Sequence, residues 1–305
     1  MRIVSLLPST TEIICVLGLE KQLVGRSHEC GQSSYIRSLP ALTSPEMKPE
    51  NTSREIHTSV QSLVENGLSV YTVDGEALGR LEPDLILTQD HCEVCAASLD
   101  EVEKAVQAFC MPGTNVVSVS PETLDEIFDS FLTIGRAANV HEIAAERVEE
   151  LKMRMEIISR TMNGTARKKV VPLEWLDPLM TGGNWIPELV EIAGGDPCLA
   201  EAGKHSPVID WNAVVDGNPD KLLLMPCGYT IDQTKKEMHL LTGRKEWKNL
   251  KAVKNDEVYL LDGDRFFNRP GPGIYESARI LAEILHPSLF KPISRNDGWI
   301  HWNHS

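Results

Sequence analysis

Apolar runs and turn residues alternate along the first 120 residues in the order expected for strands followed by helices. The runs at residues 2–7, 23–27, 69–73, 83–88 and 115–119 predict five strands, and the continuous run at 83–88 is typical of a parallel strand covered on both faces. Ser9, with Glu12 three residues later, predicts a capped helix start. This order predicts an α/β lobe.

The second half of the chain repeats the plan. Residues 169–175, 219–225 and 257–261 predict strands, and two helices are expected, one from about 187 to 194 and one over 274–285. The pair Pro219-Asp220 echoes Pro83-Asp84 at the start of a strand in the first half. Two α/β lobes of similar plan are therefore predicted.

A stretch without strand signals separates the two halves. Its apolar residues recur at steps of three and four, with a break near Asn139. The stretch is either two packing helices within one domain or a long helical connector, and its place between two similar halves favours the connector. The predicted domains are residues 1–120, a connector at 121–163, and residues 164–305.

Charge and composition exclude several function classes. The 305 residues carry a formal net charge of −14, which disfavours nucleic acid and anionic lipid as partners, and no apolar stretch is long enough for membrane insertion. The apolar run before Pro8 is too short for a signal peptide, so a cytoplasmic protein is expected, or a periplasmic or extracellular one if a leader was removed. Seven cysteines in a chain of this length indicate reduced thiols.

Chemistry-bearing residues follow the predicted strands, where α/β sheets bind their ligands. Five histidines and cysteines follow the second and fourth strands and form a candidate metal site: His28, Cys30, His91, Cys92 and Cys95. Thiolate and imidazole suit zinc or the axial face of a corrinoid's cobalt. Ordinary free thiols and a redox pair are the alternatives.

A second set of residues predicts a wall for a bulky organic ligand. The candidates are Trp175, Trp185, Tyr229, Phe266 and Phe267 as stacking rings, Arg269 as a fork for an amide or carboxylate, Ser9 at a helix N-terminus, and Cys227. The competing roles are core packing for the rings and Cys227, a loop-fixing ion pair for Arg269, and helix capping for Ser9.

Several motifs in order resemble a known family. They are RIVSLLPSTTEI (2–13), LGLEKQLVGRS (17–27), EPDLILT (82–88), AGGDP (193–197), NPDKLLL (218–224) and VYLLDGD (258–264). The chain resembles the helical-backbone metal receptors, the periplasmic substrate-binding proteins of ABC transporters for vitamin B12, haem and siderophores, and above all the cobalamin-binding branch. The resemblance implies the class III fold, two doubly wound lobes with central parallel sheets joined by a long interdomain helix.

The resemblance also implies a function. The chain is expected to bind cobalamin or a related corrinoid in a cleft between the lobes without chemical change, and to hand it to an ABC transporter permease if exported. The rival is a zinc hydrolase that uses the histidines and cysteines, with Glu29 or Asp90 as base. A docking module with an empty cleft is a third alternative. No nucleophile elbow or Ser/His/Asp order assigns a catalytic residue.

Overall fold

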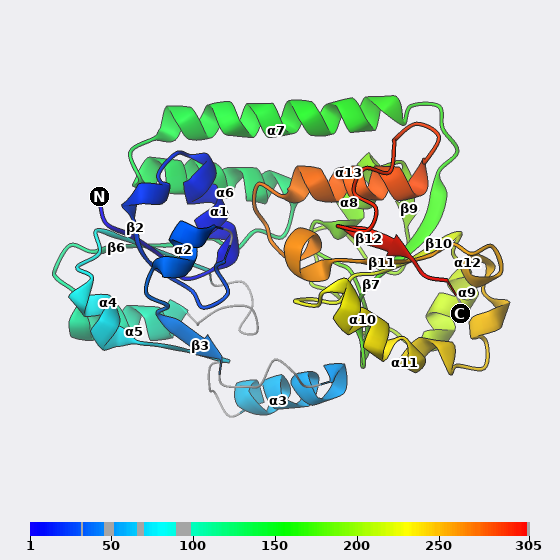
Figure 1. Ribbon diagram of the computed structural model, residues 1–305, viewed down its shortest axis with the longest axis horizontal. Helices are drawn as coiled ribbons and strands as arrows, with labels where there is room; N and C mark the ends of the chain where they lie inside the picture. Colours follow the sequence, from blue (N-terminus) through cyan, green and yellow to red (C-terminus); the bar gives the residue numbers. More distant parts are fainter. Residues whose placement is uncertain (32, 46–51, 66–69, 90–98, 304–305) are drawn as a thin grey trace. The chain divides into compact units, whose positions relative to one another are not determined.

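The computed structural model describes residues 1–31, 33–45, 52–65, 70–89 and 99–303 (Figure 1). The chain divides into two compact units. The first comprises residues 1–51, 55–121 and 125–150, and the second comprises residues 52–54, 122–124 and 151–305. Each unit has its own central sheet and its own apolar core.

The sheet of the first unit is wholly parallel, in the order β2-β1-β5-β6. Its central strands are buried along their whole length, as predicted for strands covered on both faces. The elements up to residue 118 are β1 (Ile3–Ser5), α1 (Pro8–Val16), η1 (Glu20–Gln22), β2 (Leu23–Arg26), α2 (Ser34–Ser38), β3 (Thr43–Pro45), α3 (Ser53–Glu65), β4 (Tyr71–Val73), α4 (Gly75–Arg80), β5 (Leu85–Thr88), α5 (Leu99–Phe109) and β6 (Asn115–Ser118).

The predicted third strand exists but lies outside this sheet. It is β4, and it pairs antiparallel with β3 in a separate two-stranded sheet. All three residues of β4 are half-buried, whereas β1 and β5 are fully buried. A short strand with an open face is suited to a small antiparallel ribbon and not to the middle of a parallel sheet.

The start of α1 differs from the expected capping box. The helix begins at Pro8, and its N-cap, Leu7, makes no side-chain cap. Proline suits the first helical turn because its φ is fixed and the missing N–H would have no partner there. Ser9 therefore lies inside the first turn and is buried.

Two helices follow β6, with the break where the pattern predicts it. They are α6 (Leu124–Ala137) and α7 (His141–Thr161), and between them Asn139 has φ 59°. A Cβ added to Gly135 would lie 2.4 Å from the Cβ of Ala144, so α6 and α7 pack closely. Within the described residues, every helix is too short or too polar to span a bilayer.

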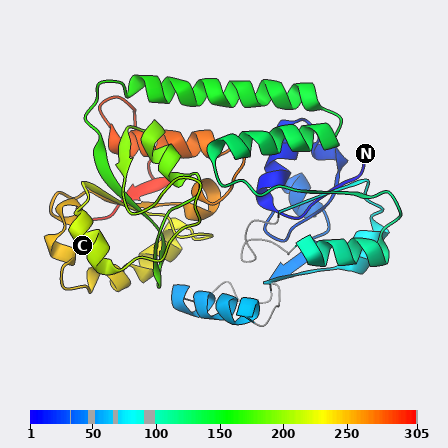
Figure 2. The same cartoon turned by 180° about the vertical axis from the view of Figure 1, so that it is seen from behind.

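The second unit is built on a mixed sheet in the order β12-β11-β10-β7-β8, and β9 also pairs with β7. The pairs β7–β10 and β10–β11 are parallel, whereas the edge strands β8 and β12 are antiparallel to their neighbours. Figure 1 shows α8 and α13 on one face of the sheet and α10 and α11 on the other, and Figure 2 shows the same layers from behind.

The bounds of the remaining elements are β7 (Lys168–Leu176), β8 (Leu179–Thr181), α8 (Ile186–Ile192), β9 (Gly195–Pro197), α9 (Trp211–Gly217), β10 (Lys221–Leu224), α10 (Ile231–Glu237), α11 (His239–Thr242), η2 (Trp247–Asn249), α12 (Lys251–Lys254), β11 (Val258–Leu261), η3 (Gly263–Phe267), α13 (Ile274–Leu285) and β12 (Trp299–His301). The element η3 is a π-helix. Single π-turns of this kind are frequent at functional sites.

Candidate functional site

Each sheet has a carboxyl edge, the edge at which its parallel strands end. In the first unit the carboxyl end of β2 leads into His28 and Cys30. In the second unit β7 ends at Trp175 and Leu176, β10 leads into Cys227 and Tyr229, and β11 leads into η3. Ligands of open α/β sheets bind at such edges.

The hydroxyl of Thr43, which is itself bonded to Ser27, holds His28 at the carboxyl edge of the first unit. The Oγ1 atom of Thr43 accepts hydrogen bonds from the backbone N–H of His28 at 3.1 Å and contacts His28 Nδ1 at 2.8 Å. The Thr43 hydroxyl donates to Ser27 Oγ at 3.1 Å. Burial, assisted by the positive charge of Arg26, lowers the pKa of His28 below its ordinary value, so the ring is neutral at pH 7.

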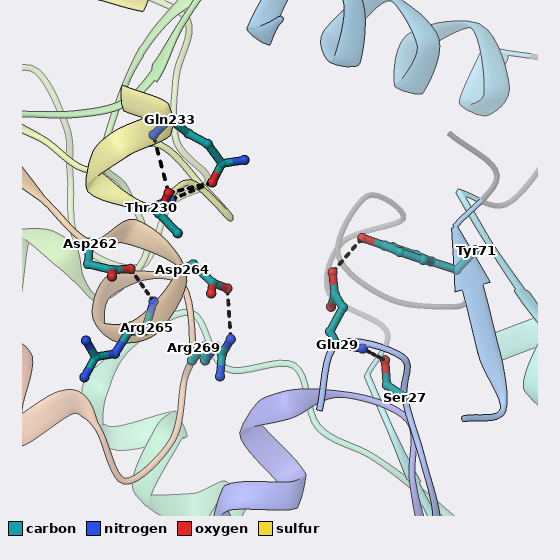
Figure 3. A network of polar contacts seen from close by, with 9 residues as sticks. All are labelled: Ser27, Glu29, Tyr71, Thr230, Gln233, Asp262, Asp264, Arg265 and Arg269. Carbon is teal, nitrogen blue, oxygen red and sulfur yellow. Dashed lines mark hydrogen bonds and ion pairs between the residues drawn. The ribbon is translucent and has the colours of Figure 1, made fainter. Parts of the chain in front are cut away.

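The ring of Tyr71 packs against that of His28. The two ring centroids are 5.3 Å apart, and the Tyr71 hydroxyl donates to Glu29 Oε1 at 3.3 Å (Figure 3). The backbone N–H of Glu29 donates to Ser27 Oγ at 3.3 Å. The strand β4 therefore contributes a residue to this edge, although it lies outside the main sheet.

The predicted metal cluster lies only in part within the described residues. Cys30 is 1% exposed, and its Sγ lies 3.1 Å from Thr11 Oγ1. Burial raises its pKa, which favours a neutral thiol over a thiolate. His91, Cys92 and Cys95 lie outside the described residues, and the described ones include no group of three or more His, Cys, Asp or Glu that could hold a metal ion. The five-residue site stays a prediction.

Trp175 and Tyr229 meet at the carboxyl edge of the second unit. Their rings lie edge to face, with centroids 5.3 Å apart. The indole N–H of Trp175 donates to the carbonyl of Asp177 at 3.1 Å. Burial and the charge of Glu237 raise the pKa of Tyr229, so its hydroxyl stays protonated. The half-buried Cys227 lies nearby, and its backbone N–H donates to the carbonyl of Glu174 at 3.0 Å.

The π-helix η3 carries a network of acids and arginines. Asp262 caps it by accepting from the backbone N–H of Arg265 at 3.0 Å (Figure 3). Arg269 Nη2 donates to Asp264 Oδ1 at 2.9 Å, and both side chains are partly exposed. Arg265 forms two hydrogen bonds to the Asp297 carboxylate, at 2.8 and 3.2 Å.

The predicted wall residues differ in accessibility. Phe266 is half-buried and faces the Arg265 guanidinium, whereas Phe267 is 1% exposed and packed in the core. Trp185 is buried just before α8, and Ser9 is buried inside α1. The structure therefore brings together Trp175 and Tyr229, and places Phe266 and Arg269 on and just after η3.

Sequence reasoning missed several polar residues of these edges. In the first unit they are Thr43 and Tyr71. In the second unit, Ser206 donates to Glu174 Oε2 at 2.9 Å and accepts from the backbone N–H of Gly183 at 2.9 Å. Ser206 follows no strand and belongs to no motif, so the sequence offers no signal for it.

A cavity of about 520 Å³ lies in the second unit, away from the carboxyl edge. Lys168, Lys221, Glu257 and His286 are among its lining residues, and the first three lie at or next to the amino ends of β7, β10 and β11. The buried ammonium of Lys221 contacts the Glu257 carboxylate, so its charge is already matched. Strand direction, not cavity size, therefore places the candidate site at the carboxyl edge.

The chain is similar to a characterised family and to one curated relative. The family model described as periplasmic binding protein matches residues 3–265. YvrC of Bacillus subtilis strain 168, described as an uncharacterized ABC transporter substrate-binding lipoprotein, is 26% identical over 297 residues, which cover 95% of this chain and 81% of YvrC.

Two solved structures share the fold. A protein of Staphylococcus epidermidis described as "a possible an iron-binding (periplasmic solute-binding) protein" superposes with a TM-score of 0.71 at 22% identity, covering 93% of this chain and 98% of that one. The vitamin B12 binding protein BtuF of Vibrio cholerae superposes with a TM-score of 0.65 at 20% identity, covering 94% and 97%. The predicted fold is confirmed: two α/β lobes with parallel central sheets, the class III architecture.

Proposed function

Since the chain belongs to the periplasmic binding protein family, the substrate-binding proteins of ABC transporters, we propose that it binds an intact corrinoid, cobalamin or a close relative. The ligand is bound and released without chemical change. The residues proposed to hold it lie at the carboxyl edge of the second unit's sheet, where aromatic and polar side chains gather.

The observation that carries this proposal is the Asp264–Arg269 pair. Its guanidinium offers N–H donors and its carboxylate offers acceptor oxygens, 2.9 Å apart at their point of contact. A primary amide has one acceptor oxygen and two N–H donors, so such a pair can bind both ends of it. Corrinoids carry primary amides around the ring, whereas haem carries carboxylates and catecholate siderophores carry negative charge.

The balance of charges at the carboxyl edge of the second unit also favours a corrinoid over haem. Among the described residues, its arginines already face acids: Arg269 faces Asp264, and Arg265 faces Asp297. Asp262 and Glu174 add two further carboxyl groups. An edge rich in carboxyl groups repels the propionates of haem and accepts a ligand whose rim is neutral.

Trp175 and Tyr229 supply the apolar part of the site. The half-buried Trp175 offers the aromatic surface, and Tyr229, which is 5% exposed, packs edge to face against it. The hydrogen bond from the Trp175 indole to Asp177 fixes the ring orientation. Rigid rings lose little conformational entropy when a flat macrocycle packs on them. Phe266 adds a third, half-buried ring.

We extend the proposal to the partner and the place of action. YvrC is described as a lipoprotein of an ABC transporter, and on that likeness the partner is an importer permease. An importer takes its ligand from outside the cell. The proposed location is therefore on the outer side of the cytoplasmic membrane, in place of the cytoplasmic location expected from the first residues.

Calorimetric titration with cyanocobalamin and with haemin tests the ligand class. Cyanocobalamin is expected to bind with a Kd of about 1 μM or tighter, and haemin at least about tenfold more weakly. In the Arg269→Met variant, cyanocobalamin affinity should fall about tenfold, because the amide oxygens lose a donor and Asp264 loses its partner. Arg160→Met, which removes an exposed ion pair on α7, is the matched control and should bind as the parent does.

Tighter binding of haemin than of cyanocobalamin would contradict the corrinoid assignment. An Arg269→Met variant that binds both ligands as the parent does would contradict the role of the Asp264–Arg269 pair.

A further inference from the structure

The cavity of about 520 Å³ lies at the amino edge of the second unit's sheet, the edge at which its parallel strands begin. The strands β7, β10 and β11 run parallel, so this edge is opposite the one that carries Trp175 and Tyr229. All the described residues that line the cavity belong to the second unit. Its volume lies within the range of small-molecule sites, and it can be considered as a site separate from the carboxyl edge.

One half of the cavity carries charged side chains. Glu257 Oε2 accepts hydrogen bonds from the buried ammonium of Lys221 and, at 2.6 Å, from the hydroxyl of Tyr259, so these two charges match each other. The half-buried Lys168 adds a second ammonium. Since Lys221 pairs with Val170 in the sheet, Lys168 and Lys221 project from the same face.

The surplus positive charge of Lys168 is only partly offset by its surroundings. Leu285 lines the cavity and ends α13, so the C-terminus of that helix brings a partial negative charge of about half an elementary charge. Asp220 also interacts electrostatically with Lys168, but its carboxylate already accepts from the Lys251 ammonium and the backbone N–H of Lys169. Among the described lining residues, positive charge therefore exceeds negative charge.

The other half of the cavity is apolar. Its apolar lining residues are Ala166, Leu285, Pro287 and Leu289. Leu285 is 2% exposed and Leu289 is 49% exposed, so this lining extends from the core to the surface. A small inorganic anion would leave these side chains uncovered, whereas an organic anion with an apolar body would remove them from water.

We infer that this cavity binds a small organic carboxylate with an apolar body, such as a medium-chain fatty acid, and that Lys168 contacts its carboxylate. The single negative charge of a carboxylate matches the surplus of about one positive charge, whereas a phosphate ester carries nearly two negative charges. The apolar body packs on Leu285 and Leu289. The inference goes beyond the proposed function, because the site uses no residue of the carboxyl edge.

Calorimetric titration with four probes tests the chemistry of the site. Octanoate has both the carboxylate and the apolar body, acetate has the carboxylate alone, 1-octanol has the body without a charge, and octylammonium has the body with the opposite charge. Octanoate is expected to bind with a Kd of about 100 μM or tighter, and each of the other three at least about tenfold more weakly.

Variants identify the residues that bind octanoate. Lys168→Met should weaken octanoate binding about tenfold, and Lys168→Arg should retain it, because the charge is kept. Lys248→Met removes an exposed lysine of η2 in the same unit and is the matched control, which should bind as the parent does. Leu289→Asp places a negative charge in the apolar half at an exposed position, and should also weaken binding about tenfold. Circular dichroism checks that each variant is folded.

A competition experiment separates the two edges of the sheet. Octanoate should bind with the same affinity in the presence of saturating cyanocobalamin, and Lys168→Met should bind cyanocobalamin as the parent does. Octanoate that is displaced by cyanocobalamin would lie at the carboxyl edge and would overturn the inference.

The remaining outcomes also decide the matter. Equal octanoate affinity in the parent and Lys168→Met, or binding of acetate, 1-octanol or octylammonium as tight as that of octanoate, overturns the inference. So does a parent that fails to bind octanoate at low millimolar concentration. None of these results affects the corrinoid assignment, which cyanocobalamin titration tests by itself.

Discussion

Asp262 combines a structural role with an unfavourable ionisation. Its carboxylate caps η3, but burial and, to a lesser extent, the neighbouring Asp264 raise its pKa, against the smaller opposite effect of the Arg265 N–H bond. A carboxyl whose pKa is higher in the folded state binds protons more tightly there. As the pH falls from the raised pKa of folded Asp262 toward the ordinary value of the unfolded chain, protonation of this carboxyl therefore increases the free energy of unfolding.

We predict that Asp262→Asn removes this cost while keeping the cap, since asparagine caps about as well as aspartate. At pH 7 the variant should be as stable as the parent or more stable. Its advantage should shrink toward pH 4, where the parent's carboxyl becomes protonated. Urea unfolding at both pH values measures this, and an advantage that grows as pH falls would show that the pKa is not raised.

Some residues of the candidate site could be predicted from the sequence and others could not. The positions of Trp175 and Tyr229 could be predicted because Trp175 lies at the end of an apolar run and Tyr229 follows one, and strand direction determines where such residues lie. Thr43 could not, because its bond to His28 spans 15 residues and depends on how α2 and β3 turn the chain back. Phe266 and Phe267 looked equivalent, but the π-helix leaves the first ring half-buried and turns the second into the core.

Glu283 joins elements of the second unit that are distant in sequence. It lies on α13 and is almost fully buried, and its carboxylate accepts from Arg279 Nη1 at 2.8 Å, the backbone N–H of Ser294 at 3.0 Å and the Trp299 indole N–H at 3.0 Å. These bonds tie the helix to β12 and to the loop that leads into it. A buried carboxylate surrounded by three donors is costly to alter.

We predict that Glu283→Gln lowers the free energy of unfolding by about 2–4 kcal/mol, because an amide nitrogen cannot accept from the donors that face it. The matched control is Glu156→Gln, an exposed ion-pair partner on α7, which should cost less than about 0.5 kcal/mol. Urea unfolding followed by circular dichroism measures both. Equal losses for the two variants would mean that the three bonds add little.

The sequence predicted long or continuous elements and missed short ones. The runs of β5, β7 and β10 carry enough apolar residues to identify a buried strand. The strands β8, β9 and β12 have three residues each, which is too few for a period to show. They form because a neighbouring strand of the larger sheet has backbone groups available to pair with them. That pairing depends on tertiary structure and leaves no local pattern in the sequence.

At the scale of the whole molecule, the order of motifs identified the architecture better than any one of them. Segments such as EPDLILT and NPDKLLL encode the approach to a buried parallel strand, β5 in one unit and β10 in the other. That is a requirement of the fold, so these motifs predict architecture well and ligand poorly. Ligand choice depends instead on residues such as Asp264 and Arg269, whose pairing appears only in the folded chain.

Equilibrium dialysis against an equimolar mixture of cyanocobalamin, haemin and a ferric catecholate siderophore tests the central claim most directly. All three are metal chelates, but only cyanocobalamin has a rim of neutral amides, so the retained compound reports on the chemistry that the site recognises. The protein should retain cyanocobalamin at about one equivalent and exclude most of the two anionic chelates. Retention of haemin or the siderophore in preference to cyanocobalamin would contradict the account.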